Sequence, residues 1–231
     1  MKITYYGHSC FGIQIGQSNI LIDPFISGNP HAAAIAIDDI QADYIFLSHG
    51  HTDHVLDAEH IASQKGSLII SNYEVAKWYE NKGLKTHGLN IGGAITLPFG
   101  KAKMLVAVHS STMPDGTYGG IAGGFVFETT EGNFYFAGDT ALTEDMKLLP
   151  IIAAPLDFAI LPIGDNFTMG FQDAVHAARF IGCSNIFGCH YDTFPPIEIN
   201  QEDAITAFYS HNCQLTLLKI GESFDFAEES K

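Results

Sequence analysis

The sequence predicts an α/β fold made of two similar halves, and three observations support this prediction. Each half begins with short apolar runs of strand length separated by Gly-rich turns, and segments with helical spacing follow. No low-complexity linker, charge run or short repeat marks a boundary between the halves. The 231 residues suffice for one large domain with a buried core, so we expect both halves to share a core in a single domain, residues 1–231.

The first half is expected to start as an antiparallel meander. Its strands are separated by the turn signals GHS and GQS and cover Lys2–Tyr6, Phe11–Ile15 and Asn19–Ile22. The continuous apolar run Tyr44–Leu47 predicts a further strand, buried on both faces. The remaining elements are a helix over Asp57–Gln64, a strand over Ser67–Ile70 and a helix over Tyr73–Lys82.

The second half is predicted to repeat this order of strands followed by helices. Its first strands cover Ile95–Leu97, Met104–Val108, Phe125–Glu128 and Phe134–Ala137. Helices and strands then alternate, over Glu144–Ile152, Phe158–Leu161, Gly170–Phe180, Asn185–Phe187, Gln201–His211 and Leu215–Lys219.

The composition limits the partners and the compartment. The formal net charge of −15 argues against a surface for nucleic acid or an anionic membrane, so we expect a small-molecule substrate. The chain begins without the apolar run of a signal peptide, and no stretch is long enough to span a membrane. Its four cysteines show no C-x-x-C spacing and are expected to be buried thiols in a reducing compartment. We therefore expect a soluble, cytoplasmic protein, and the sequence leaves open whether it forms a homo-oligomer.

A run of ionisable residues follows the apolar stretch Tyr44–Leu47. The sequence LSHGHTDHV places His49, His51, Asp53 and His54 within six residues, on a loop at the end of the predicted strand. Alternate residues of an extended loop point the same way, so His49 and His51 can face one cation while Asp53 and His54 turn toward its neighbour. The spacing predicts a site for two adjacent metal ions, which in hydrolases lie roughly 3.5 to 4 Å apart.

Three more residues of ligand type follow predicted strands of the second half. His109 follows in MLVAVHSS, Asp139 in FYFAGDT and His190 in NIFGCHYD. Strand ends converge on one rim of a sheet in α/β folds, so we expect these residues to join the first group. A structural zinc site would be closed by four ligands, usually with cysteine, whereas seven candidates without cysteine favour an open and reactive site.

The motif H-x-H-x-D-H, followed by isolated His, Asp and His at strand ends, resembles that of the metallo-β-lactamase-fold hydrolases over essentially the whole chain. More narrowly, YYGHSCF, ILIDPF, LSHGHTDH and LPIGDNFTMG resemble a branch of uncharacterised metal-dependent hydrolases related to ascorbate-6-phosphate lactonase. The resemblance implies a four-layer αββα sandwich. It also implies a metal site at the strand-end rim between the two sheets.

Transferred to this sequence, the family pattern implies two metal ions that share one carboxylate. One ion is expected on His49, His51 and His109, the other on Asp53, His54 and His190, with Asp139 as the bridge. All seven positions are filled, and Asp53 is also expected to act in catalysis by orienting the nucleophile. Imidazole and carboxylate ligands suit Zn²⁺ first, and also Mn²⁺, Fe²⁺ or Ni²⁺.

We therefore expect a metal-dependent hydrolase in which a bridging hydroxide attacks a small ester, lactone or phosphodiester. Diiron oxygen-reducing members of the fold resemble this pattern but carry Glu at the position of His51, and true β-lactamases with two zinc ions usually lack a bridging Asp at the position of Asp139. The sequence leaves two alternatives open. They are an iron-containing redox protein and a metal-stabilised binding module on the same fold.

Three further residues are candidates for substrate contact or for support of the ligands: His8, Asp165 and Asn166. His8 in the GHSC turn could equally be a loop histidine that bonds to backbone. The segment 28–40, GNPHAAAIAIDDI, could cover the site or pack on the core. His176 and His211 are expected to be surface residues without a role in the site.

Overall fold

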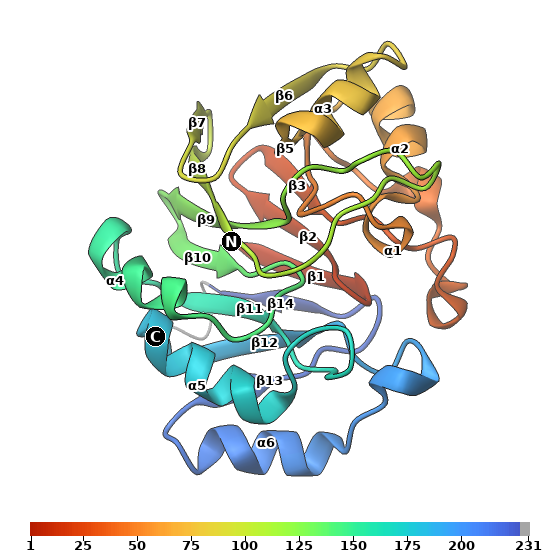
Figure 1. The fold of residues 1–231 in the computed structure, drawn as a ribbon. Helices are drawn as coiled ribbons and strands as arrows, with labels where there is room; N and C mark the ends of the chain where they lie inside the picture. The colour runs from red at the N-terminus through yellow and green to blue at the C-terminus, as the bar shows by residue number, and fades with distance from the viewer. Residues whose placement is uncertain (227–231) are drawn as a thin grey trace.

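Two seven-stranded β-sheets pack face to face in the computed structural model, which describes residues 1–226 (Figure 1). Helices cover the outer side of each sheet, which confirms the predicted αββα sandwich. The first sheet has the order β14-β1-β2-β3-β4-β5-β6 and the second β13-β12-β11-β10-β9-β8-β7. The predicted single domain extends to residue 231, and residues 227–231 lie outside the described part.

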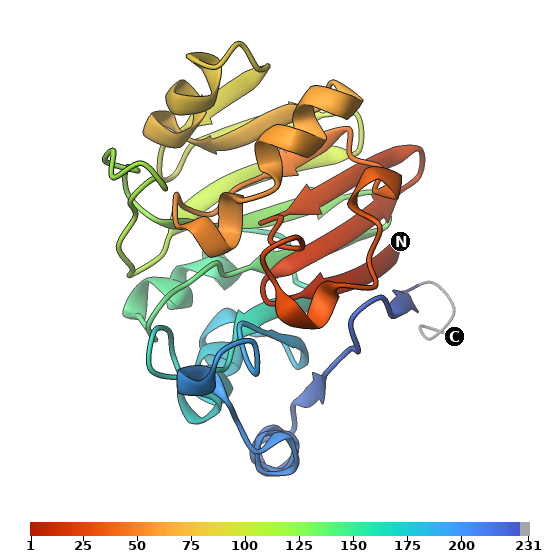
Figure 2. The ribbon, with the colours of Figure 1, turned by 90° about the vertical axis from the view of Figure 1, so that its right-hand side faces the viewer.

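The strands of the first sheet are β1 (Lys2–Gly7), β2 (Cys10–Ile15), β3 (Ser18–Ile22), β4 (Tyr44–Phe46), β5 (Leu68–Asn72), β6 (Thr86–Leu89) and β14 (Ser223–Asp225). The strands of the second are β7 (Ala94–Leu97), β8 (Gly100–Val106), β9 (Gly123–Thr129), β10 (Gly132–Phe136), β11 (Phe158–Pro162), β12 (Asn185–Cys189) and β13 (Gln214–Thr216). After the second sheet is complete, the chain returns to the first, where β14 pairs with β1 (Figure 2).

The two sheets have the same internal plan, as the repeated order of elements predicted. In the first, β1, β2 and β3 form an antiparallel meander, and β4, β5 and β6 are added in parallel. In the second, β8, β9 and β10 form the meander, and β11, β12 and β13 are added in parallel. Strands β1, β3 and β4 therefore run the same way, as do β8, β10 and β12, so their carboxyl ends lie on one edge of each sheet.

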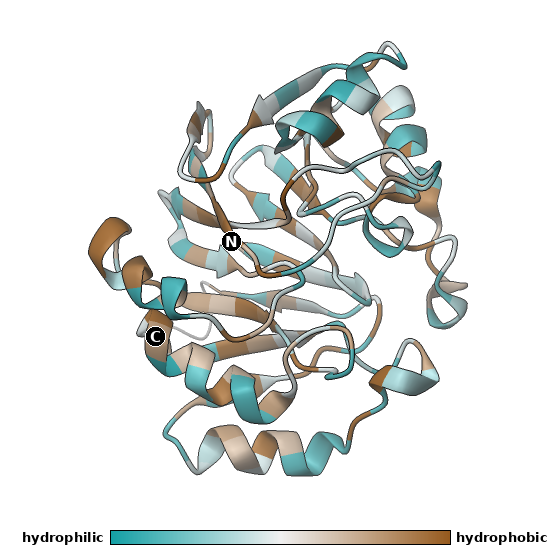
Figure 3. Cartoon of the chain, viewed as in Figure 1, coloured by the Kyte–Doolittle hydropathy of each residue, from teal (hydrophilic) through white to brown (hydrophobic). Residues whose placement is uncertain are grey.

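The helices of the first half are α1 (Thr52–Val55), α2 (Ala58–Lys65) and α3 (Tyr73–Glu80), with the 3-10 turns η1 (Pro30–Ala32) and η2 (Ile37–Asp39). Those of the second half are α4 (Leu149–Ile152), α5 (Phe171–Ile181) and α6 (Gln201–Tyr209), with η3 (Glu144–Leu148) and η4 (Pro195–Ile197). Hydrophobic and hydrophilic residues alternate along α5 and α6, as expected for helices that bury one face (Figure 3). Within residues 1–226, no helix has the length and apolar character needed to cross a membrane.

Phenylalanine side chains fill the space between the sheets. The rings of Phe127 and Phe134 stack at 4.4 Å between centroids, and those of Phe134 and Phe158 at 4.9 Å. Phe46 packs edge-on against Phe127 from the opposite sheet, at 4.9 Å. Such ring pairs add to the hydrophobic stabilisation of burial. The sheets are therefore held together below the strand ends, and the rim above is available for polar residues.

Several boundaries differ from those predicted. The segment Glu144–Ile152 is not one helix but η3 followed by α4, because Pro150 has no N–H with which to continue an α-helical ladder. The edge strands β6 and β14 were not predicted, and β13 is shorter than the predicted strand Leu215–Lys219. Edge strands bury fewer side chains, so their sequences carry a weaker apolar pattern.

The segment 28–40 lies against the outer face of the first sheet. Its two 3-10 turns place Ala32 and Ile40 in the interior, and Ile35 and Ile37 pack on the same apolar cluster. This cluster also contains Leu21 of β3, on the face opposite the second sheet. The structure thus shows the core-packing alternative for this segment.

Candidate metal centre

The H-x-H-x-D-H motif begins where β4 ends and continues into α1. The predicted extended loop is in part wrong, because Thr52–Val55 forms a helical turn with His51 as its N-cap. The backbone N–H groups of His54 and Val55 both donate to the carbonyl of His51. Because of this turn, the side chains of the motif point to two different sides. His49 and His51 face one side, and Asp53 and His54 face the other.

His49, His51 and His109 form one group of candidate ligands, drawn from both sheets. One ligand atom from each lies within 4.8 Å of the others. Nε2 of His49 and Nδ1 of His51 are 3.0 Å apart, and donor atoms that share one Zn²⁺ ion are expected at about that separation. The Nδ1 of His49 bonds to the Ser48 hydroxyl at 2.9 Å. Because that hydroxyl donates to Asp23, the ring of His49 donates through Nδ1 and keeps its Nε2 lone pair free.

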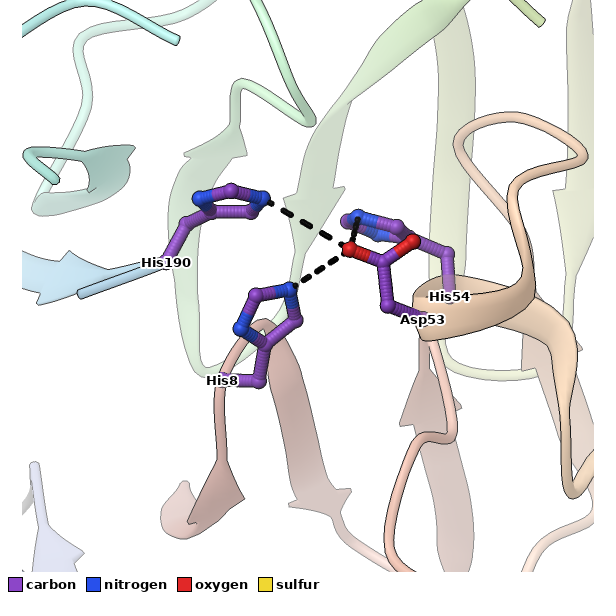
Figure 4. Close-up of side chains that lie close together, drawn as sticks. All are labelled: His8, Asp53, His54 and His190. Atoms are coloured by element: carbon purple, nitrogen blue, oxygen red, sulfur yellow. Dashed lines mark hydrogen bonds and ion pairs between the residues drawn. The ribbon is translucent and has the colours of Figure 1, made fainter. Parts of the chain in front are cut away.

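The second group contains Asp53, His54 and His190, and His8 joins it (Figure 4). Oδ2 of Asp53 lies 3.1 Å from Nε2 of His8, 3.8 Å from that of His54 and 3.9 Å from that of His190. Asp53 is 29% exposed, whereas the three histidine side chains are buried. The structure thus brings together the two predicted sets and adds His8 to one of them, while their role as ligands stays a prediction.

Asp139 lies between the two groups. Its Oδ2 is 3.0 Å from Nε2 of His190 and 3.2 Å from that of His54, in the second group. The same oxygen is 3.6 Å from Nε2 of His109 and 4.0 Å from that of His49, in the first group. The backbone bend before it depends on Gly138, whose φ is +64° and where a Cβ would come 2.6 Å from the carbonyl of Gly123.

Asp23 supports both groups and was not among the predicted site residues. Its Oδ2 accepts a hydrogen bond from Nδ1 of His54 at 2.8 Å and another from the Ser48 hydroxyl at 2.5 Å, and its Oδ1 accepts from the backbone N–H of Ser48 at 2.8 Å. A carboxylate behind a ligand histidine fixes the tautomer and orientation of the ring. Asp23 directly follows β3, so the rule that selected Asp139 could have selected it too.

Burial favours the neutral form of four of these histidines, which is the form that binds a cation. It lowers the pKa of His8 to about 4 and lowers the pKa values of His49, His51 and His109 as well. His54 is the exception. Burial again lowers its pKa, but the nearby carboxylates, Asp139 first, together raise it well above its usual value.

The buried polar atoms of the site also fit a cation. Among the described residues, Nε2 of His54 and Oδ1 of Asp139 are buried without any hydrogen-bond partner. A buried polar atom without a partner costs about 1–3 kcal/mol, so such atoms are rare in native proteins. A metal ion between the two groups would give these atoms partners. The donor set, imidazole nitrogen and carboxylate oxygen, suits divalent transition metals.

The other candidates lie outside the two groups. Asp165 and Asn166 are exposed on a turn between β11 and α5, both with positive φ, and Oδ1 of Asp165 accepts from the backbone N–H of Asn166. This turn reaches the site through Met169, whose N–H donates to the carbonyl of Thr140, the residue after Asp139. His176 is exposed on α5, as predicted.

Comparison with known proteins agrees with this geometry. Residues 18–191 match the family model described as a β-lactamase superfamily domain. The chain is 53% identical to a UPF0173 metal-dependent hydrolase of Flavobacterium johnsoniae, over 97% of this chain and the whole of that protein. The chain belongs to the UPF0173 family of metal-dependent hydrolases, within the metallo-β-lactamase superfamily. A member of this family from Methylacidiphilum infernorum is 47% identical over 96% of this chain and 99% of its own.

Solved structures show the same fold. Igni18, described as a novel metallo hydrolase from the archaeon Ignicoccus hospitalis, superposes with a TM-score of 0.87 at 29% identity, over 97% of this chain and 98% of that one. CmlA of Streptomyces venezuelae, a diiron β-hydroxylase, gives a TM-score of 0.75 at 12% identity, over 97% of this chain and 54% of its own. That likeness shows the fold alone. As a UPF0173 protein the chain is a metal-dependent hydrolase, and its predicted relation to ascorbate-6-phosphate lactonase stays a prediction.

The first testable prediction separates ligand histidines from surface ones. His51→Ala or His109→Ala should each remove a ligand from the first group, so metal content and hydrolysis should both fall sharply. His176→Ala should leave both nearly unchanged, because its side chain is exposed on α5 and belongs to neither group of candidate ligands. Elemental analysis and a hydrolysis assay on the three purified variants test this, and equal losses in all three would show that the assignment is wrong.

The second prediction concerns Asp23→Asn. Asparagine tolerates the positive φ of 43° at this position but offers one acceptor oxygen instead of two. The orientation of His54 and of His49 should therefore loosen, and metal affinity should fall by about 10- to 100-fold, as for other residues that support a ligand histidine. Competition with a chelator of known affinity measures this, and affinity within about twofold of wild type would contradict it.

Proposed function

We propose that this protein is a dinuclear metal-dependent hydrolase. The observation that carries the proposal is the position of Asp139, whose Oδ2 lies within 4.0 Å of histidine nitrogens from both candidate groups. A site for a single metal ion would require only one of the two groups of candidate ligands. A buried carboxylate between two sets of imidazole nitrogens is suited to offset the mutual repulsion of two cations.

Bound metal ions supply Lewis acidity, which activates water near neutral pH and stabilises the developing oxyanion. The chain's own residues arrange this chemistry. Asp53, His51 and His109 retain some exposure, whereas His49, His54 and Asp139 are buried, so a substrate can approach from the side of the first three. The partly exposed carboxylate of Asp53 would both hold a cation and orient a water molecule toward the substrate.

The loops around the site indicate the charge of the substrate. They comprise residues 7–9, 23–29, 48–57, 107–122, 138–143, 164–170 and 190–200, and they contain neither Lys nor Arg. A phosphate or carboxylate group on the substrate would therefore meet no cationic side chain from these loops. Val108 and Phe167 are 51% and 54% exposed there, both in segments bonded to Thr140. We infer that an uncharged ester or lactone fits better than a phosphodiester or a phosphorylated lactone.

This inference gives a third prediction. The metal-loaded protein should hydrolyse a neutral nitrophenyl ester or an uncharged lactone with a kcat/KM at least about tenfold higher than its kcat/KM for bis(nitrophenyl) phosphate. The reason is that the loops around the site offer no cationic side chain to the phosphate anion. A preference for the phosphodiester would contradict the inference about charge, although it would still support a hydrolase. Absence of hydrolysis with every ester, lactone and phosphodiester, together with oxygen-dependent oxidation by an iron-loaded form, would favour the redox alternative.

The fourth prediction tests the shared carboxylate. Asp139→Asn keeps the shape but removes the charge and leaves one good donor oxygen, so one metal site should weaken far more than the other. We expect about two transition metals per chain in the wild type and about one in the variant. The variant should lose most of the hydrolytic rate, while its metal-free form should keep the thermal stability of the metal-free wild type. Elemental analysis, calorimetry and the ester assay measure these quantities. Two retained metals with full activity would show that Asp139 is a turn residue and not a shared ligand.

A further inference from the structure

His8 lies in the second group of candidate ligands, although the seven-residue pattern does not include it. It stands in the two-residue connection between β1 and β2, and it is 1% exposed. One donor atom from each of His8, Asp53, His54 and His190 lies within 4.8 Å of the other three, and Nε2 of His8 is 3.1 Å from Oδ2 of Asp53. Figure 4 shows its ring turned toward the oxygen of Asp53, beside His190.

Hydrogen bonds fix which nitrogen of His8 faces the site. Its Nδ1 is 2.9 Å from the hydroxyl of Thr193, and that hydroxyl donates its only hydrogen to the carbonyl of Tyr191. The hydroxyl must therefore accept from His8, which places the ring hydrogen on Nδ1. The neutral ring then directs the Nε2 lone pair at Oδ2 of Asp53, 3.1 Å away. Two acceptors this close repel each other unless they share a cation, and about 3 Å is the separation expected for two donors on one metal ion.

The backbone holds His8 in this place. Its carbonyl accepts a hydrogen bond of 2.8 Å from the N–H of His190, so the β1–β2 turn is tied to the end of β12 in the other sheet. Both residues have positive φ, 55° for His8 and 54° for His190. Non-glycine residues adopt this conformation at a cost, and such strain is concentrated at functional sites.

Contact between His8 and substrate does not fit these surroundings. The rings of Phe25 and Phe194 lie against the imidazole, each with its centroid 5.5 Å away, and His54 and His190 lie on other sides of it. A side chain enclosed in this way can reach a cation held by Asp53, but a substrate cannot reach it without displacing the aromatic rings.

We propose that His8 is a protein ligand of the second metal ion, through Nε2, together with Asp53, His54 and His190. The proposal rests on the proposed metal-dependent function. With the bridging Asp139, the second ion would have five protein ligands, against four for the first ion. The second ion should therefore be held more tightly and be lost later to a chelator.

The test compares His8→Asn with Thr193→Val, using Co²⁺ alone as the probe metal. Asparagine tolerates the positive φ, and its amide can still donate to Thr193, but it does not extend to the position of Nε2. We expect His8→Asn to weaken the tighter of the two Co²⁺ sites at least about 100-fold in competition with a chelator, beyond the effect of losing a supporting residue, and to change the visible spectrum of that ion. Thr193→Val keeps both nitrogens of His8, so it should weaken the site less and leave the spectrum unchanged.

An unchanged Co²⁺ spectrum in His8→Asn would overturn the proposal, whatever happens to hydrolysis, because the ion would then not be bound by Nε2 of His8. Should the Asn variant fail to fold, His8→Gln places an amide oxygen near the position of Nε2, and the same spectral change with weaker binding is expected. If the wild type binds one Co²⁺ only, the dinuclear proposal fails. The spectrum of that single ion in His8→Asn still decides whether His8 is one of its ligands.

Discussion

Burial of carboxylate and imidazole groups where two apolar sheets meet is the constraint on which the rest of this structure depends. Asp139 is 2% exposed, and an isolated carboxylate there would be strongly disfavoured. His54 and His190, which come from different sheets, together hold its pKa well below the usual value although burial alone would raise it. The charge is thus tolerated only because both halves of the chain direct histidines at it.

A second set of buried hydrogen bonds connects these side chains to the backbone. The carboxylate of Asp23 orients His54 directly and His49 through the Ser48 hydroxyl, so one residue sets a ring in each candidate group. The carbonyl of Ser48 also accepts from the N–H of Gly123 in the opposite sheet, at 3.0 Å. Under the dinuclear proposal, substitution at Asp23 should therefore affect both metal ions together, whereas loss of a single candidate ligand histidine should affect mainly one.

Much of this arrangement was predictable, because strands buried on both faces and glycine-rich turns have strong sequence patterns. The two halves and the grouping around H-x-H-x-D-H followed from apolar runs that end in ligand-type residues. The helical turn at Thr52–Val55 and the edge strands β6 and β14 were not predicted, since elements of three or four residues carry too little periodicity to detect. Asp23 was not predicted because it stands after β3 in the segment ILIDPF, without a histidine beside it. The hydrogen bond between His8 and Thr193 joins residues 185 positions apart, so no local sequence pattern indicates it.

The strand directions explain why the site must form at this rim. In the first sheet His8, Asp23 and His49 follow β1, β3 and β4, and in the second sheet His109, Asp139 and His190 follow β8, β10 and β12. Because these strands run the same way within each sheet, six polar residues reach one edge without any strand bending out of the core. Neither half holds a complete set of the proposed ligands. Metal binding at these residues would therefore favour the packed arrangement of both sheets over any state in which they separate, and it would link metal occupancy to the stability of the whole fold.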